Sequence, residues 1–167
     1  MTQRFTIAEK VIATLLIIWG CLQITAVLVS YYNIFYSLKD FPQIKFSAFR
    51  IIKNVHPVLL GSAISMLAGI FLFLNKKSAW FFATSACLLN MLLYFIPIYK
   101  NEKVSSIDRA SKWVILILLM ALWMASLYVL LLKPVRVKYS VTNRAYIWVL
   151  AITVFVAIDH WVVYLTN

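Results

Sequence analysis

The chain alternates long apolar stretches with short polar connections. Five stretches contain no lysine, arginine or glutamate, and each is close to the length of about 20 residues that a helix needs to cross the hydrocarbon layer. The apolar runs are continuous, whereas strands of a membrane barrel alternate apolar and polar residues. The sequence therefore predicts five transmembrane helices, over residues 11–32, 57–74, 80–99, 113–132 and 146–165.

The connections between these stretches differ in character. Residues 75–79 form a tight turn, which predicts an antiparallel hairpin of the second and third helices. Residues 33–56 form the longest connection, and from Ile44 onward most of its apolar residues share one helical face, with Lys45, Arg50 and Lys53 elsewhere. This pattern predicts a basic amphipathic helix in the headgroup plane, between helices one and two. The alternative is an irregular loop that covers the bundle.

The composition agrees with a chain that lies almost entirely in lipid. Hydrophobic residues make up 64% of the sequence and charged residues 13%, against about half and about a quarter in a typical soluble domain. No repeat or linker divides the chain. We therefore expect an all-α, polytopic membrane bundle that forms one domain over residues 1–167, integral to a plasma or inner membrane.

The net charge of +11 comes from 16 lysines and arginines, all in the N-terminal tail or the connections. In these positions they are typical of anchors for anionic lipid headgroups, and no nucleic-acid-binding motif accompanies them. Besides Lys45, Arg50 and Lys53 of the first connection, we assign Lys133, Arg136 and Lys138 to the membrane surface. An odd number of helices places eight cations on each side, so orientation depends on the short basic tail, which favours a cytoplasmic N-terminus.

The second helix carries a packing motif in which Gly61, Ser65 and Gly69 recur at every fourth position. Small residues at this spacing allow a neighbouring helix backbone to approach closely, which is a main source of helix association in lipid. The motif can serve the bundle itself, the interpretation that we favour, or a contact between chains. We also expect a homo-oligomer or a partner membrane protein.

Two amides lie near the middle of apolar stretches. Gln23 is in the first predicted helix and Asn90 in the third, and these two helices run in the same direction. Each amide lies nine residues before the end of its helix, so the two side chains are expected at one level of the bundle. An amide pair in lipid fixes the register of two helices.

Asp159 is the only acidic residue inside any predicted span. Because an ionised carboxylate in hydrocarbon is unfavourable by about 2.5 kcal/mol or more, it should face the bundle, pair with a donor or bind a proton. Its level matches Tyr94, the region of Thr25 and Ser62, and the outlying His56. An aspartate near a helix end that reaches water or a tyrosine hydroxyl is the structural alternative to a functional role.

The sequence offers little support for an enzyme. It contains no GxSxG or HExxH motif and no glycine-rich phosphate loop. The two histidines have no metal-ligand spacing, so we predict neither metal nor cofactor. The leading hypothesis is a non-enzymatic scaffold, anchor or regulatory subunit of a membrane complex. The alternative is a small transporter or pore with a polar path near Asp159, Asn90 and Gln23.

Overall fold

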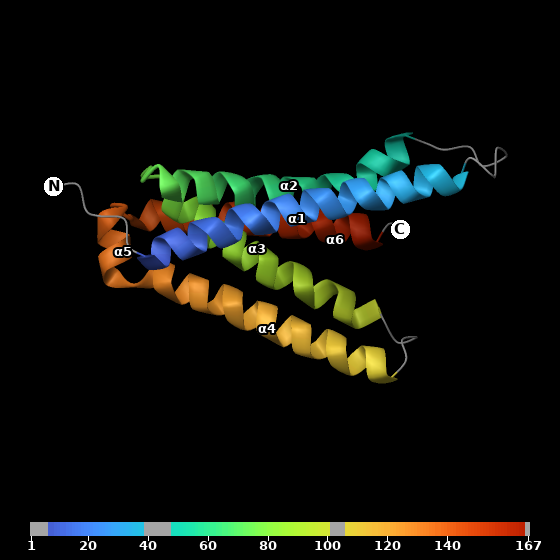
Figure 1. Ribbon diagram of the computed structural model, residues 1–167. Helices are drawn as coiled ribbons and strands as arrows, with labels where there is room; N and C mark the ends of the chain where they lie inside the picture. Colours follow the sequence, from blue (N-terminus) through green and yellow to red (C-terminus); the bar gives the residue numbers. More distant parts are fainter. Residues whose placement is uncertain (1–6, 39–47, 101–105, 166–167) are drawn as a thin grey trace.

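A computed structural model describes residues 7–38, 48–100 and 106–165, with side chains described for residues 7–33, 36, 55–92 and 113–163. The described residues form helices joined by short turns and contain no strand, which confirms the all-α prediction (Figure 1). The elements are α1 (Ile7–Leu38), α2 (Ala48–Phe73), α3 (Ala79–Lys100), α4 (Ser106–Leu131), α5 (Lys133–Lys138) and α6 (Asn143–Leu165).

Four helices contain a described stretch that is long and apolar enough to cross a membrane, and together they indicate a membrane location. These stretches are Ile7–Asn33, Val55–Phe73, Trp113–Leu131 and Asn143–Val163. The apolar part of α3 that is described, Ala79–Leu92, is shorter than a span. The prediction of an all-helical bundle is confirmed, with four helices long and apolar enough to span a membrane, and the fifth span stays a prediction.

The second helix lies at the centre of the bundle. α1 runs along α2, α3 folds back against α2, and α6 packs against both α2 and α3. α4 packs mainly against α3 and diverges from α1 and α2 with distance from α5 (Figure 1). Half of the α2 span, 50%, is buried within the chain, against 17% of the α4 span. α4 is therefore peripheral and presents most of its apolar surface outward.

The turn between α2 and α3 closes in a way that the residue types explain. Asn75, two residues after the end of α2, adopts a positive φ of 50°, a conformation that asparagine tolerates better than most residues. The Lys76 N–H then donates to the Phe71 carbonyl at 3.0 Å, which satisfies a carbonyl at the end of the helix. The chain reverses here, and α2 and α3 form the hairpin that the short connection predicts.

The first connection is shorter than predicted. α1 continues to Leu38, and α2 already begins at Ala48, so residues 48–56 are its first turns rather than a separate element. Pro57 lies inside α2. Proline lacks an N–H and crowds the carbonyl four residues earlier, which kinks a helix, and Figure 1 shows the first turns of α2 at an angle to the rest. Lys45 lies outside the described residues, as do the side chains of Arg50 and Lys53.

The small residues of α2 face the inside of the bundle. A Cβ atom added at Gly69 would lie 2.6 Å from the Ala13 carbonyl oxygen of α1. Gly20 of α1 makes the reciprocal approach, because a Cβ there would lie 2.8 Å from the Ser62 carbonyl oxygen. Gly61 and Ser65 are also buried. The backbones of α1 and α2 therefore meet closely where the motif of small residues lies.

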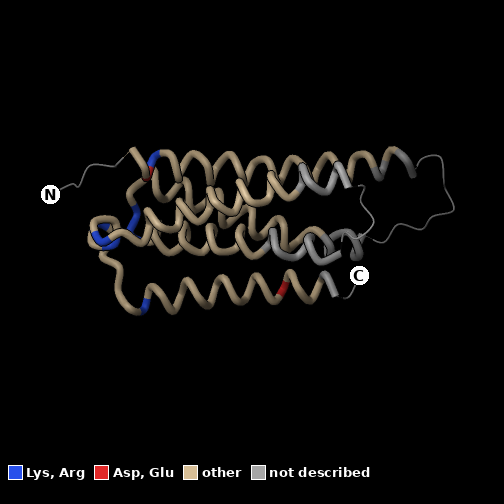
Figure 2. Tube along the Cα trace, turned by 90° about the horizontal axis from the view of Figure 1, so that it is seen from below, with Lys and Arg blue, Asp and Glu red and all other residues tan. Residues whose placement is uncertain are grey.

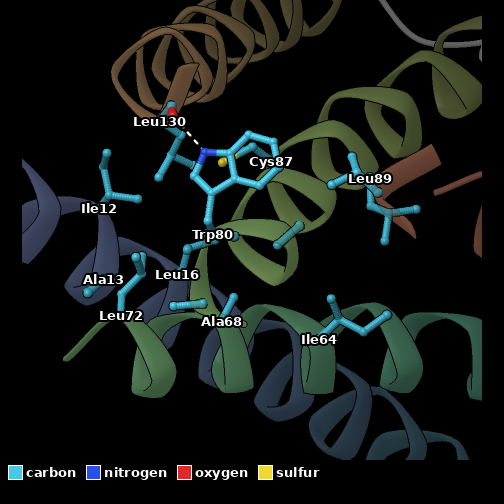
Figure 3. Close-up of a cluster of buried hydrophobic side chains, with 14 of the residues drawn as sticks. Ile12, Ala13, Leu16, Ile64, Ala68, Leu72, Trp80, Cys87, Leu89 and Leu130 are labelled. Carbon is cyan, nitrogen blue, oxygen red and sulfur yellow. Dashed lines mark hydrogen bonds between the residues drawn. The ribbon is translucent and has the colours of Figure 1, made fainter. Parts of the chain in front are cut away.

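Side chains from every described helix meet in one hydrophobic core. Trp80 of α3 is 1% exposed and lies among residues of α1, α2 and α4 (Figure 3). Its neighbours in the close-up include Leu16, Ala68, Leu72 and Leu130. The core extends to the end of the bundle where α5 lies, through Leu130, Val135 and Tyr139.

Candidate polar and charged sites

Asn90 is the hub of a polar network in the middle of the bundle. Its Oδ1 atom accepts hydrogen bonds from Trp19 Nε1 at 3.0 Å and from Gln23 Nε2 at 3.5 Å. Its Nδ2 atom donates to Ser65 Oγ at 3.3 Å. Ser62 Oγ completes the set by donating to Gln23 Oε1 at 3.0 Å. The sequence predicts that Gln23 and Asn90 lie at one level of the bundle. The structure places the two side chains within hydrogen-bond distance.

The network connects α1, α2 and α3 through side chains that carry no charge. Ser65 Oγ also donates to the Gly61 carbonyl at 3.0 Å, so the hydroxyl that accepts from Asn90 is itself oriented. Buried polar groups with satisfied partners rigidify a core and specify one arrangement of its elements. The chemistry available at this level is hydrogen bonding and register, because none of these side chains binds or releases a proton near neutral pH.

A second polar pair joins α2 to α6. His56 Nε2 lies 3.0 Å from Asp159 Oδ1 and 3.0 Å from Asp159 Oδ2. The two side chains are 42% and 28% exposed. His56 follows the polar residues Lys53 and Asn54 near the start of the apolar part of α2, and Asp159 lies six residues before Leu165, the last residue of α6. The pair therefore lies near one end of each helix. Tyr94, predicted at this level, has no described side chain.

A third pair lies at the opposite end of the bundle and is almost completely buried. Lys138 Nζ, at the end of α5, lies 3.0 Å and 2.9 Å from the two carboxylate oxygens of Glu9, in the first turn of α1. Glu9 is 0% exposed and the Lys138 side chain 9%. Lys138 therefore differs from the predicted membrane-surface role: its ammonium points into the protein because the only described carboxylate at this end is there.

The Glu9 carboxylate also influences its other neighbour. Burial raises the pKa of the Tyr139 phenol above its ordinary value, and the negative charge of Glu9 raises it further. Sequence reasoning missed this site because Glu9 was assigned to the N-terminal tail. The sequence does hold an indication of this pair. The N-terminal tail and the fourth connection are predicted on the same side of the membrane, and Glu9 is the only acidic residue in these two segments.

The other described cations collect around the same end. Figure 2 shows the described lysines and arginines at the end where α1 and α6 begin and where α5 lies. Lys133 and Arg136 of α5 are exposed, as the membrane-surface assignment requires. The exposed cations of the neighbouring segments are Lys10, Lys76, Lys77 and Arg144.

The described residues show no group of three histidine, cysteine, aspartate or glutamate side chains that could hold a metal ion. Cys21 and Cys87 are free thiols. No family model matches the chain, and neither a curated protein nor a solved structure matches it. Any functional conclusion therefore rests on the geometry of the polar network, the two ion pairs and the exposed surface.

Proposed function

We propose that the protein is a non-enzymatic, multi-pass membrane protein that acts as a scaffold, anchor or regulatory subunit of a membrane complex. The observation that carries this proposal is the network around Asn90. Its hydrogen bonds join neighbouring helices to one another, which is the arrangement expected of a rigid core rather than of a path for a solute. If the interior is a rigid core, the protein contacts other molecules through the outer surface of the bundle.

The outer surface is extensive and apolar. Only 17% of the α4 span and 22% of the α6 span are buried within the chain. Large side chains such as Leu118 and Phe155 are exposed at 64% and 68%. Lipid tails cover such surfaces, and so do the helices of other membrane proteins, where association depends on close packing. This surface supports a role within a complex, either with copies of the chain or with a partner.

We further propose that α3 is a fifth span. It has 22 residues, Ala79–Lys100, and would be about 33 Å long at 1.5 Å per residue, enough to cross the hydrocarbon layer. The first turns of α2, before Pro57, then lie in the headgroup layer. The end that carries Lys10, Arg136 and Arg144 then faces the cytoplasm, because the short basic N-terminal tail lies at this end.

Native mass spectrometry after extraction in a mild detergent tests the subunit proposal. The expected result is a mass above that of one chain, from further copies or from a companion protein. The Asp159→Asn variant should give the same assembly, because its side chain belongs to the α2–α6 contact rather than to the outer apolar face. A spectrum that contains only single chains under conditions that preserve the fold would overturn the proposal.

The transporter or pore remains the second candidate, and the His56–Asp159 pair favours it. Two partly exposed titratable groups, each near one end of an apolar helix, are typical of proton relays and cation pathways. Ser62, in the Asn90 network, follows His56 by six residues on the same helix, about 9 Å further along its axis. Asp159 would then mark one level of a polar path, and the pair Gln23 and Asn90 the next level.

Flux across proteoliposomes separates the two candidates. A transporter should carry protons or small cations faster than empty liposomes, and Asp159→Asn should abolish that flux while leaving the assembly unchanged. Lys77→Gln, on the exposed α2–α3 turn, is the matched control and should retain full flux. If the wild-type protein carries neither protons nor small cations above the background of empty liposomes, the transporter candidate is wrong.

A further inference from the structure

The Arg136 guanidinium is exposed, yet it is held in place. Its Nη1 atom donates a hydrogen bond to the Tyr146 hydroxyl at 3.1 Å. The Arg136 N–H donates to the Leu132 carbonyl at 3.1 Å, and its own carbonyl accepts from Val141 N–H at 2.9 Å. The backbone of this residue is therefore anchored on both sides, and the side chain is tethered at its tip. The bond to Leu132 is an ordinary helical one, whereas the hydrogen bond at the tip of the side chain distinguishes Arg136 from a freely rotating surface arginine.

The tether leads back to the hydrophobic core. The Tyr146 ring packs edge-on against the Trp80 ring, with centroids 5.1 Å apart and an angle of 74° between the planes. Trp80 is buried, and its Nε1 atom donates to the Leu130 carbonyl at 2.7 Å (Figure 3). That carbonyl needs a donor because Pro134, four residues later, has no N–H to give it. The Leu130 carbonyl, freed by the break between α4 and α5, thus orients Trp80. Trp80 packs against Tyr146, and the Tyr146 hydroxyl holds Arg136.

The surroundings of Arg136 are positive. Lys133 lies one turn earlier on α5 and is also exposed. Among the side chains that the structure describes at this end, Glu9 is the only acid, and it binds Lys138 inside the protein. The segment lies between the Trp113–Leu131 and Asn143–Val163 spans, so α5 lies at the level of the lipid headgroups when these helices cross the bilayer.

We infer that Arg136, positioned by Tyr146, and Lys133 form a binding site for the phosphate of an anionic phospholipid. A guanidinium has five N–H donors in a planar fork that matches phosphate oxygens. Tyr146 engages Nη1 and leaves further donors for the ligand, while Lys133 adds a point charge. The inference rests on the membrane placement in the proposed function. It differs from general attraction between cations and lipid because it requires the Tyr146 hydroxyl.

Lipid titration of the purified full-length protein in mild detergent tests this site. Native mass spectrometry measures how much phosphatidylglycerol, or neutral phosphatidylcholine, stays bound. The K133Q/R136Q variant should bind phosphatidylglycerol about fivefold more weakly for each cation removed. Y146F should also weaken binding, although it changes no charge. The matched control, K76Q/K77Q, removes two exposed cations from the same end and should bind like the wild type.

Any one of four results would overturn the site. One is an equal loss in K76Q/K77Q, which would indicate diffuse attraction; another is unchanged binding in Y146F; the third is equal retention of phosphatidylcholine. Full displacement of the lipid by inorganic phosphate would also contradict it and identify a free anion as the ligand. Thermal unfolding midpoints show whether each variant is folded. Lipid retention is independent of assembly, so a protein found only as single chains would contradict the subunit proposal without affecting this one.

Discussion

Lys138 Nζ contacts both carboxylate oxygens of Glu9, at 3.0 Å and 2.9 Å, across 129 positions of the sequence. The contact joins the first turn of α1 to the last turn of α5. Both charges are removed from water, so much of their attraction is offset by lost hydration. The pair therefore defines where α1 meets the α5 segment more than it adds net stability.

Removing only one partner of this pair should be strongly destabilising. Lys138→Met leaves the Glu9 carboxylate buried without its ammonium, and we expect the free energy of unfolding to fall by about 3–5 kcal/mol. The double variant Glu9→Gln/Lys138→Met should recover most of that loss. Unfolding in mixed micelles with increasing denaturing detergent measures both values. Lys10→Met, at an exposed neighbouring position, is the control, and a loss as large as that of Lys138→Met would contradict the prediction.

A methyl group at Gly69 should disrupt the contact between α1 and α2. The added Cβ would lie 2.6 Å from the Ala13 carbonyl oxygen and 2.6 Å from Ile17 Cγ1, and the backbone oxygen cannot move aside alone. Gly69→Ala should lower the free energy of unfolding by about 1–3 kcal/mol, as overpacking does elsewhere. Unfolding in mixed micelles with increasing denaturing detergent measures this loss. Ala63→Leu, on the exposed face of α2, should be tolerated, and equal losses would show that the approach at Gly69 is not tight.

Loss of the Asn90 side chain should weaken the association of α1 with α3. Asn90→Leu leaves Trp19 Nε1 and Gln23 Nε2 without the acceptor that they share. Interhelical hydrogen bonds in membrane proteins contribute about 0.6 kcal/mol on average and about 1.7 kcal/mol at most, so a loss in that range is expected. A double-mutant cycle with Gln23→Leu should be non-additive. Additive losses would mean that the two amides act independently.

Alkaline stability should depend on Tyr139. The pKa of Tyr139 is raised in the folded protein, mainly by burial and further by the charge of Glu9. A tyrosine in the unfolded chain titrates at about pH 10. Above that pH the unfolded state loses a proton that the folded state keeps, so stability must fall as the pH rises. Tyr139→Phe should make this fall shallower. Unfolding curves at several alkaline pH values measure the slope, with the exposed Tyr128→Phe as control; identical slopes for wild type and Tyr139→Phe would refute it.

Much of the site geometry followed from counting residues along helices of known direction. Gln23 and Asn90 are predicted at one level because their helices run in the same direction. In the structure Gln23 Nε2 lies 3.5 Å from Asn90 Oδ1. Asp159 was expected at a level that includes His56, and the two side chains are in contact. Counting residues does not reveal which way a side chain points around the helix axis. Lys138 was assigned to the surface because it lies in a connection, and neither this assignment nor counting related Glu9 to any partner.

Helix ends were harder to predict than helix centres. Residues 33–38 were assigned to a connection because they follow the aromatic residues at the end of the first apolar stretch, yet α1 continues to Leu38. Residues 48–56 likewise belong to α2. Hydropathy reports where a helix leaves the apolar layer, whereas the backbone hydrogen bonds of a helix can continue beyond it. The separate amphipathic helix predicted around Arg50 and Lys53 is not confirmed, because the structure makes residues 48–56 part of α2.

The sequence by itself determined that this chain forms apolar helices suited to a membrane, because the solvent of a segment depends on its own composition and length. Only the tertiary structure decided which faces of the helices meet. In lipid, apolar side chains gain little by contacting one another, so faces are selected by close approach and by polar pairs. Gly69 against Ala13, Asn90 with Trp19, and Lys138 with Glu9 each depend on segments far apart in the sequence, and no local pattern encodes that choice.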